Sequence, residues 1–357
     1  MKQSTIRFKI IRLFMVLTMI FGIILTSCSK KEAAVVIPPA DKIALKAAIV
    51  VAQGLISGSV EGTKPGQYEV GSQLALLAIL NPSKGVDADG SATQAAVNNS
   101  LAQLTAAITA YQGHLITEIA PANLIGFWKF NGNTIDSSGK GNNGVATVGA
   151  AYYGAGTLAL TADRFGRANS AYHFDKGANV QIPYSTSLNP QQMTISLWVK
   201  KSLGTPARTI NTDTYTMVAM NRWNGYKFQL QSGNLTFFTV KADATHIYDR
   251  DNAGIALTNE VWYHVVVSFK AGNMSFYING DLVKEWTDTP LGAFTLTAPI
   301  DFVIGQDLPT SKYLTVDGDF QVAWGGYWTG DMDDVMFYNT VLTAPQVKSI
   351  YNNQKTL

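Results

Sequence analysis

The sequence has 357 residues, of which 46% are hydrophobic, 11% aromatic and 15% charged. Its 27 basic residues nearly balance its 25 acidic residues, and four of the basic residues lie within the first twelve positions. The rest of the chain is therefore slightly acidic and has no basic run, which argues against a nucleic-acid partner. Low charge together with many Tyr, Trp, Thr, Asn and Gly residues is typical of an extracellular β-protein that binds neutral ligands.

The N-terminal segment has the pattern of an export signal. Its basic residues precede an apolar run over 13–25, which is shorter than the roughly 20 residues that cross a bilayer. The run ends in "LTSC", which resembles the bacterial lipobox, and Cys28 is the only cysteine. We expect a signal peptide over 1–27, a lipidated Cys28 and a tether over 28–40, with membrane contact through acyl chains alone. The alternative is an ordinary signal peptide with a chance cysteine.

Residues 41–119 have a helical pattern. The spacing predicts helices over Asp41–Ile56, over Val70–Leu80, where "NPSKG" ends the helix, and over Ser91–Ile116. Ser91 and Gln94 have the spacing of a capping box at the start of the third helix. The segment "VEGTKPGQYEVGSQLALLAIL" resembles the FIVAR module, which occurs beside carbohydrate-active and adhesive domains of exported bacterial proteins. The resemblance implies a stalk and lends no catalytic residue.

From Asn123 onward, short alternating runs are broken by Gly, Asn and Pro about every ten residues, as in an antiparallel sandwich. "MTISLWVKK" alternates as a strand does. "VWYHVVVSFKAGNMSFYINGDLVKEW" contains the pair Asn279-Gly280, which favours a two-residue hairpin because both residues tolerate positive φ. This segment therefore predicts a meander of three strands.

Five segments carry a resemblance to a known family. They are, in order, "LIGFWKFNGNTIDSSGKGNNG", "GRANSAYHFDKGANVQIP", "MTISLWVK", "WYHVVVSFKAGNMSFYINGDLV" and "TGDMDDVMFYNTVLTAPQVKSIY". Together they resemble the LamG-like (laminin G type 3) domain of the concanavalin A-like lectin and glucanase superfamily. The resemblance implies a mainly β jelly-roll sandwich of antiparallel sheets over 122–357, after a small all-α, three-helix domain over 41–119. Lectins, glucanases and adhesion modules share this fold, so function has to be argued from the site.

The ribbon "WKFNGNTIDSSGKGNNG" is a candidate ion site. Its glycines lie among strand and turn signals, so Lys140 is read as a solvated turn residue and not as part of a phosphate cradle. Relatives with a metal here imply a structural calcium held by Asn131 and Asp136 with Asp334 of the last strand. The alternative is that Asp136 and Asn142 only cap turns.

The sequence predicts no catalytic residue. The glucanase pattern E-x-D-x-x-E is absent, and "GDMDDV" places Asp331 and Asp333 on one strand face without a following glutamate. The histidines lie apart, and His264 in "WYHVVV" is expected to have a hydrogen-bonded core role. A diverged glucanase stays an alternative.

Sugar sites combine an aromatic plate with groups that bind hydroxyls. Trp128, Trp198 and Trp262 lie in strand patterns and are read as core, and the charged run 249–251 is read as a solvated turn. The predicted ligand site lies in loops and consists of Arg222, Trp223, Asn224, Tyr313 and Trp324. The alternative is that these rings cover a loop base or the helical domain.

These patterns predict a Bacteroidetes-type outer-membrane lipoprotein, at the cell surface or the periplasmic face, that presents a glycan-binding domain on a helical stalk. A second interpretation is an adhesion or scaffold protein whose LamG-like domain binds protein. The sequence does not specify the glycan or the oligomeric state.

Overall fold

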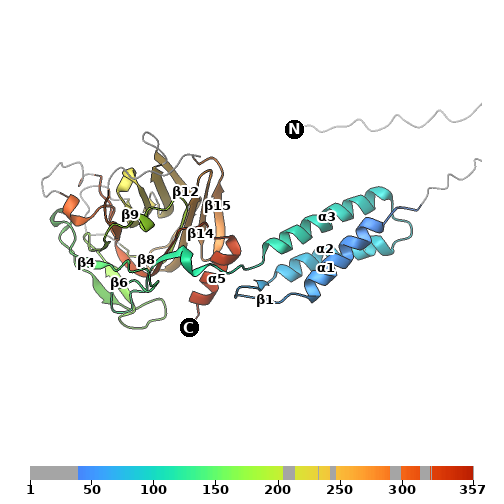
Figure 1. The fold of residues 1–357 in the computed structure, drawn as a ribbon, viewed down its shortest axis with the longest axis horizontal. Helices are drawn as coiled ribbons and strands as arrows, with labels where there is room; N and C mark the ends of the chain where they lie inside the picture. The colour runs from blue at the N-terminus through green and yellow to red at the C-terminus, as the bar shows by residue number, and fades with distance from the viewer. Residues whose placement is uncertain are drawn as a thin grey trace, which may run out of the picture.

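The computed structural model describes residues 39–203, 214–231, 233–241, 247–289, 299–313, 322 and 324–356. The export signal, Cys28 and nearly all of the tether lie outside the described residues, so lipid anchoring stays a prediction. Within the described ranges, no helix is both long and apolar enough to cross a membrane. Figure 1 shows two parts, an elongated helical bundle and a β-sandwich.

The bundle consists of α1 (Ile43–Ser57), α2 (Ser72–Ala88) and α3 (Gln94–Gly113). Between α1 and α2, the short strands β1 (Glu61–Gly62) and β2 (Tyr68–Glu69) pair in parallel. One apolar face of each helix builds the core, which contains Leu45, Ile49, Ala52, Leu76, Leu80, Val97, Leu104 and Tyr111. The predicted helical region before the sandwich is therefore confirmed.

Several helix boundaries differ from the prediction, and two of these differences have a clear structural cause. The second helix does not end at "NPSKG" but continues through Pro82 to Ala88. A proline inside a helix costs about 3 kcal/mol. Ser83 is buried and donates its Oγ to the carbonyl of Ile79 at 2.9 Å, and Val86 packs against the bundle core. Tertiary packing of this last stretch therefore outweighs the local proline signal.

The third helix begins later than predicted, and Ser91 is not its cap. Thr93 is the N-cap and accepts a hydrogen bond from the amide of Ala96 at 3.2 Å. Gln94 instead accepts from the Asp41 amide at 2.7 Å, and Ser91 donates to Asp89. The serine and glutamine have the spacing of a capping box, but Ser91 bonds within the loop before α3, and Gln94 connects the start of α3 to the residues just before α1.

The sandwich consists of two antiparallel sheets. The first has seven strands in the order β12 (Ile247–Ala256), β11 (Leu235–Lys241), β10 (Tyr226–Gln231), β9 (Tyr215–Met220), β16 (Phe302–Ile304), β7 (Asn179–Ile182) and β4 (Val145–Thr147). The second has eight strands and runs β15 (Asp281–Trp286), β14 (Asn273–Ile278), β13 (Trp262–Lys270), β8 (Met193–Lys201), β17 (Gly330–Tyr338), β6 (Ala171–Phe174) and β5 (Ala159–Thr161), while β3 (Leu124–Trp128) also pairs with β17. The predicted jelly-roll sandwich is confirmed.

The predicted meander is also present. β13, β14 and β15 are consecutive neighbours in the second sheet. Asn279 and Gly280 form the turn between β14 and β15 with φ values of 52° and 81°. Both residues thus adopt the left-handed conformation that a two-residue hairpin of this kind requires.

Side-chain alternation along β10 positions the candidate site. Tyr226, Phe228 and Leu230 point between the sheets and belong to the main apolar core. The intervening residues Lys227 and Gln229 therefore point to the outer face of the seven-stranded sheet. This face presents polar groups from adjacent strands side by side.

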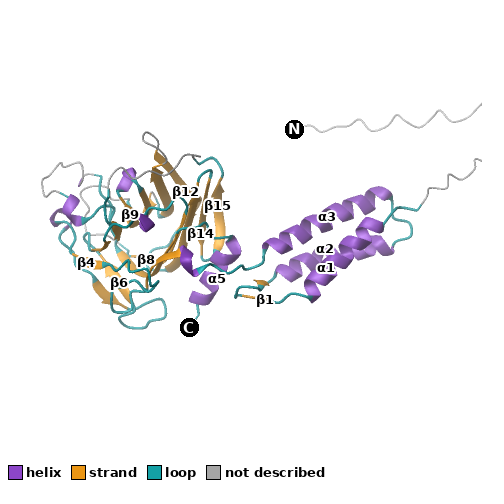
Figure 2. Cartoon of the chain, viewed as in Figure 1, coloured by secondary structure: helices purple, strands orange, loops and turns teal. Residues whose placement is uncertain are grey.

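The C-terminal helix α5 (Ala344–Gln354) packs on the outside of the eight-stranded sheet. Its Tyr351 ring stacks on Trp198 of β8, with ring centroids 5.7 Å apart. Trp198 therefore lies under α5 and not between the sheets, and Trp262 is only half-buried. Of the three tryptophans that were predicted to be core residues, only Trp128 belongs to the main core. Figure 2 shows α5 at the end of the sandwich that meets the bundle, where Ser349 donates to the carbonyl of Thr63 at 2.5 Å.

Candidate functional site

A tight turn between β9 and β10 displays the first ring of the site. The turn is a short 3-10 helix over Arg222–Asn224, and Asn221 and Arg222 both have positive φ, at 60° and 50°. A non-glycine residue in this region is strained and needs support from its surroundings. A Cβ on Gly225 would lie 2.1 Å from the carbonyl oxygen of Met220, so only glycine fits the end of the turn.

Arg222 supplies that support from inside the protein. Its side chain is 3% exposed, and its Nε donates to Asp307 Oδ2 at 2.7 Å. Its Nη2 donates to Asp307 Oδ1 at 3.3 Å and to Tyr313 Oη at 3.2 Å. Arg222 and Tyr313 were predicted to contact ligand, but the structure buries both beneath the loop. They position the turn and do not line its outer surface.

Trp223 and Trp324 come from distant parts of the chain and meet in space. Their ring centroids lie 6.1 Å apart with an interplanar angle of 67°. Trp324 is 51% exposed, which is unusual for a residue of its size. Two adjoining indole rings therefore stand at the outer face of the sheet, as the sequence predicted for an aromatic plate. Asn224, the remaining predicted residue, accepts a hydrogen bond from Lys241 Nζ at 3.2 Å.

A cavity of about 310 Å³ lies beside the two rings. Its lining includes Trp223, Trp324, Lys227, Gln229, Thr239 and Asp249. The four polar residues come from three adjacent strands, because Thr239 of β11 pairs with Asp249 of β12 and β11 pairs with β10. The sheet thus supplies a rigid polar floor, and the loops supply an aromatic rim.

Two polar atoms of this floor have no hydrogen-bond partner among the residues that the structure describes. Gln229 Oε1 and Thr239 Oγ1 are buried, and neither forms a hydrogen bond within the described part of the chain. The amide of Gln229 donates to Gln231 Oε1 at 2.6 Å, which orients the free oxygen. Buried polar atoms are normally satisfied, so unpaired ones at a cavity indicate water or ligand. A ligand rich in hydroxyl groups can both donate to and accept from such a surface.

Sequence reasoning missed most of the floor. Asp249 was predicted in a solvated turn, but it lies in β12 and lines the cavity, while Arg250 forms an ion pair with Asp288 at 2.8 Å. The alternation in "YKFQLQ" carries a usable signal, because it places Lys227, Gln229 and Gln231 on one strand face. That the face lies beside Trp324 follows only from the tertiary fold.

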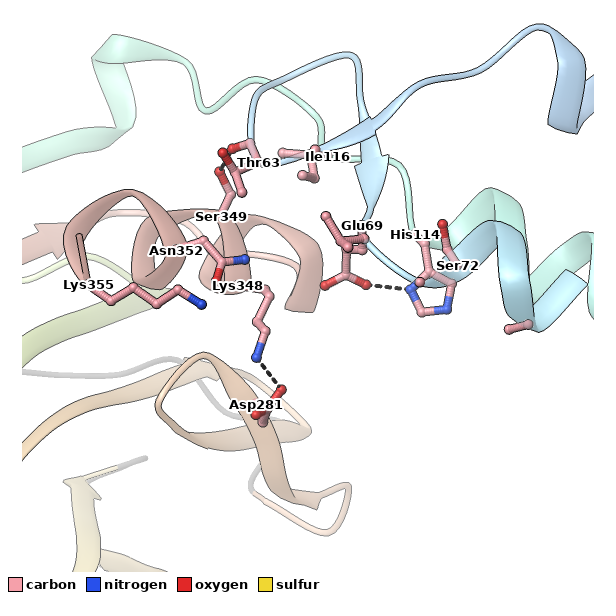
Figure 3. A pocket seen from close by; sticks show the side chains of 14 residues that line it. Thr63, Glu69, Ser72, His114, Ile116, Asp281, Lys348, Ser349, Asn352 and Lys355 are labelled. Atoms are coloured by element: carbon pink, nitrogen blue, oxygen red, sulfur yellow. Dashed lines mark hydrogen bonds and ion pairs between the residues drawn. The ribbon is translucent and has the colours of Figure 1, made fainter. Parts of the chain in front are cut away.

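A larger cavity of about 650 Å³ lies between the bundle and α5 (Figure 3). Four of its ionisable groups pair with one another, and the ammonium of Lys355 lies 5.0 Å from the centroid of the Tyr351 ring. Lys348 Nζ contacts Asp281 Oδ1 at 2.7 Å, and His114 contacts Glu69. No aromatic residue lines it among the described residues. We therefore assign the candidate site to the smaller cavity, where two buried polar atoms lack a hydrogen-bond partner among the described residues.

The residues of the expected calcium site are already engaged. Asp136 accepts hydrogen bonds from the amides of Phe127, Ser138 and Asn142 and from the Ser138 hydroxyl, at 2.8 to 3.0 Å. Burial alone would raise the pKa of Asp136, but these hydrogen bonds outweigh it and hold the pKa below its usual value. Four donors occupy the directions from which a cation would be bound.

The other two expected calcium ligands do not complete a site around Asp136. Asp334 accepts from Arg164 Nη2 at 2.8 Å, and Asn131 is exposed. Among the described residues, no group of three or more His, Cys, Asp or Glu side chains is arranged to hold a metal ion. These donors fit the turn-capping alternative and not a cation, so calcium binding stays a prediction that the contacts do not support.

The acidic residues of "GDMDDV" lie on the other sheet and are ion-paired. Asp331 contacts Lys200 Nζ at 2.6 Å and His173 Nδ1 at 2.7 Å, and Asp333 pairs with Arg164. The hydrogen bond with Asp331 raises the pKa of His173, although burial opposes it. These carboxylates belong to β17, whereas the cavity lies on the opposite sheet.

Residues 174–348 match the family model of the concanavalin A-like lectin/glucanases superfamily named Laminin_G_3. We call residues 174–348 the Laminin_G_3 region after this match. The Laminin_G_3 region contains both indole rings and the whole polar floor of the cavity. A stretch of 79 residues is 39% identical to gellan lyase from Bacillus sp, and the match covers 22% of this chain and 3% of the lyase. The chain therefore spans only a small part of that relative.

Several solved structures resemble the Laminin_G_3 region and its surroundings. Domain 4 of AbnA, an extracellular GH43 arabinanase from Geobacillus stearothermophilus in complex with arabinotriose, is 22% identical over 64% of this chain and 98% of that chain, with a TM-score of 0.48. The binding domain of Paraclostridial Mosquitocidal Protein 1 is 16% identical over 65% of this chain and 52% of that chain, with a TM-score of 0.47. A structure of botulinum neurotoxin type C, whose cell entry depends on two ganglioside molecules, is 15% identical over 65% of this chain and 51% of that chain, with a TM-score of 0.45. The sugars and gangliosides belong to those proteins.

Proposed function

We propose that the sandwich binds a glycan on the outer face of its seven-stranded sheet and does not cleave it. The observation that carries this proposal is the pair of indole rings, Trp223 and Trp324, beside a cavity in which two polar atoms have no hydrogen-bond partner among the described residues. An indole ring packs against the apolar face of a pyranose, and amides and hydroxyls bind its hydroxyl groups. The indole rings and the polar residues of the cavity floor lie side by side at this site.

The dimensions of the site agree with recognition of a short stretch of a glycan. A volume of about 310 Å³ is near the lower end of small-molecule pockets, which are roughly 300–1,000 Å³. The cavity is open at the rim, where Trp324 is exposed, so further sugar units can extend outward along the sheet. This geometry favours binding along a chain over enclosure of a single sugar.

The charges of the site favour binding over hydrolysis. Glycoside cleavage uses two carboxyl groups, about 5 Å apart in retaining enzymes and roughly 6.5–9.5 Å apart in inverting ones. Asp249 is the single carboxylate among the lining residues that the structure describes. The acidic residues of β17 are paired with Arg164 and Lys200 on the other sheet. A donor and a nucleophile facing one sugar bond are therefore not assembled in the described part of the cavity.

The N-terminal third is proposed to display this site. A lipidated Cys28 would hold the chain in the outer membrane, and the FIVAR-like bundle would act as a stalk. The 20 residues of α3 span about 30 Å, which lifts a domain well clear of a lipid surface. Hydrogen bonds from α5 to Thr63 and Thr117 connect stalk and sandwich.

Affinity electrophoresis of the chain without its signal peptide tests the proposal. The wild type is run through gels that contain neutral or acidic polysaccharides, beside Trp223→Ala and Trp324→Ala. Loss of one ring is expected to cost about 1–2 kcal/mol, or roughly tenfold in Kd. Trp262→Ala is the matched control, because Trp262 is half-buried on the other sheet, and it should be retained like the wild type.

The outcomes separate the three interpretations. Retention that neither tryptophan substitution weakens would place the glycan elsewhere. Absence of retention on every polysaccharide, with capture of a protein partner through the same rings, would favour an adhesion module. Release of reducing sugar that disappears in Asp333→Asn would favour a diverged glucanase.

A further inference from the structure

Lys227 is a buried cation at the candidate site that has no counter-ion or hydrogen-bond acceptor among the described residues. It lies on β10, is 4% exposed and lines the cavity. Its ammonium is 5.3 Å from the centroid of the Trp223 ring. Within the described residues, no hydrogen bond or ion pair to this ammonium is present. Removing an ammonium from water is costly unless an anion or several hydrogen-bond acceptors replace the water.

Other buried cations of the sandwich have polar partners. The guanidinium of Arg222 is neutralised by Asp307 at 2.7 Å. Lys241 donates to Asn224 Oδ1, and Lys201 donates to Asn259 Oδ1, both at 3.2 Å. Lys227 alone among these four faces the cavity without such a contact. Its position therefore suggests that the missing partner comes from a ligand.

The charges around Lys227 leave room for an anion. Burial has the largest effect on the pKa of Lys227 and lowers it. The carboxylates of Asp307 and Asp249 raise this pKa, whereas the charge of Arg222 lowers it. Asp307 is already paired with Arg222, and Asp249 is exposed at the rim, where it can accept a sugar hydroxyl. The charged groups among the described lining residues are thus the ammonium of Lys227 and the carboxylate of Asp249, and no ion pair joins the two.

We propose that the glycan carries an acidic group, the carboxylate of a uronic acid or a sulfate ester, and that this group pairs with the ammonium of Lys227 while the sugar ring packs on Trp223. The inference rests on the proposed glycan function and refines its substrate class. An ion pair with hydrogen bonding in a desolvated pocket is among the stronger polar contacts. It also revises the composition argument, which favoured a neutral ligand.

Pairs of polysaccharides that differ only in charge test this inference. The chain without its signal peptide is titrated with polygalacturonate, alginate and dextran sulfate, and with carboxyl-reduced polygalacturonate, carboxyl-reduced alginate and dextran. The variants are Lys227→Gln, Lys227→Met and the matched control Lys241→Gln on the adjacent strand. Lys227→Met keeps the side-chain length and its packing on Trp223, so it covers the case in which the glutamine variant folds poorly.

We expect the wild type to bind at least one acidic polymer more tightly than its neutral counterpart. Both Lys227 variants should weaken that binding roughly 10- to 100-fold. They should weaken binding of the acidic polymer more than binding of its neutral counterpart, and Lys241→Gln should behave as the wild type. Loss of affinity on carboxyl reduction would identify a uronic acid, and a preference for dextran sulfate over dextran would identify a sulfate ester.

Two results would overturn the inference. If wild type and Lys227→Met bind the acidic polymers with equal affinity, Lys227 does not pair with the acidic group of the glycan. If only the neutral polymers bind, and the binding depends on Trp223 and Trp324, the acidic substrate class is wrong while the proposed glycan function stands. If none of the polymers nor any member of a wider glycan array is retained, both proposals fail together.

Discussion

The buried histidine of β13 makes the stability of the sandwich depend on pH. His264 is fully buried, and its ring contacts the rings of Trp198 and Tyr351 at centroid distances of 5.4 and 5.9 Å. Its Nε2 lies 2.8 Å from Ser196 Oγ, as expected for a hydrogen-bonded core role. Burial, with a smaller contribution from the Arg164 charge, lowers the pKa of His264 from 6.5 to about 3.

The sign of the effect follows from proton uptake. The unfolded chain binds a proton at this histidine below about pH 6.5, whereas the folded chain keeps it neutral down to about pH 3. The stability is therefore complete above pH 6.5 and decreases as the pH falls through this window. At pH 5, protonation of His264 stabilises the unfolded state by about 2 kcal/mol relative to the folded state. The value follows because pH 5 lies about 1.5 units below the pKa of the unfolded chain, and each unit corresponds to about 1.4 kcal/mol.

The assay compares wild type with His264→Gln in urea at pH 7 and pH 5. All seven tryptophans lie at or after Trp128, so their fluorescence reports on the sandwich and not on the bundle. Glutamine can keep a hydrogen bond to Ser196 but does not titrate. The wild type should lose about 2 kcal/mol more than the variant between the two pH values, or roughly 4–8 °C in Tm.

Equal losses in the two proteins would refute this reasoning. Such a result would mean that His264 takes up a proton in the folded state as readily as in the unfolded state. The other titrating groups, including His173, are common to both proteins and cancel in the comparison. The difference between the two proteins, and not the pH dependence of either one, is therefore the decisive quantity.

Three further predictions follow from buried contacts. Asp307→Asn should lower the free energy of unfolding in urea by about 3–5 kcal/mol, because the Arg222 guanidinium stays buried and loses the negative charge of Asp307. The control Asp288→Asn removes an exposed ion pair and should cost under about 1 kcal/mol. Gly280→Ala should lower the free energy of unfolding by about 1–3 kcal/mol, because φ is 81° and a Cβ would lie 2.8 Å from a side-chain atom of α5. An unchanged free energy of unfolding would show that the hairpin can shift. Removal of calcium with EDTA should leave Tm unchanged, because four donors already surround Asp136, and a Tm that rises with added calcium would contradict this.

Local patterns predicted the architecture well because strand and turn preferences agree with the fold. The run "MTISLWVKK" is β8 to the residue, and Asn279-Gly280 forms the expected turn. Where a tertiary contact competes with a local signal, the prediction failed. Pro82 lies inside α2 because the following turn packs on the bundle, and Trp198 lies under a C-terminal helix whose docking the strand pattern does not encode.

The sequence by itself determined the two-part organisation, the sandwich and the two indole rings in glycine-rich loops. Each of these depends on residues close together in the chain, where backbone preference and side-chain period act directly. Only the tertiary structure decided what surrounds the rings. In the structure, Arg222 points inward and pairs with Asp307, and Asp249 lies in a strand where a turn was expected. The ammonium of Lys227 faces an open cavity. Burial and charge pairing depend on strands that are distant in sequence, and those two properties define this site.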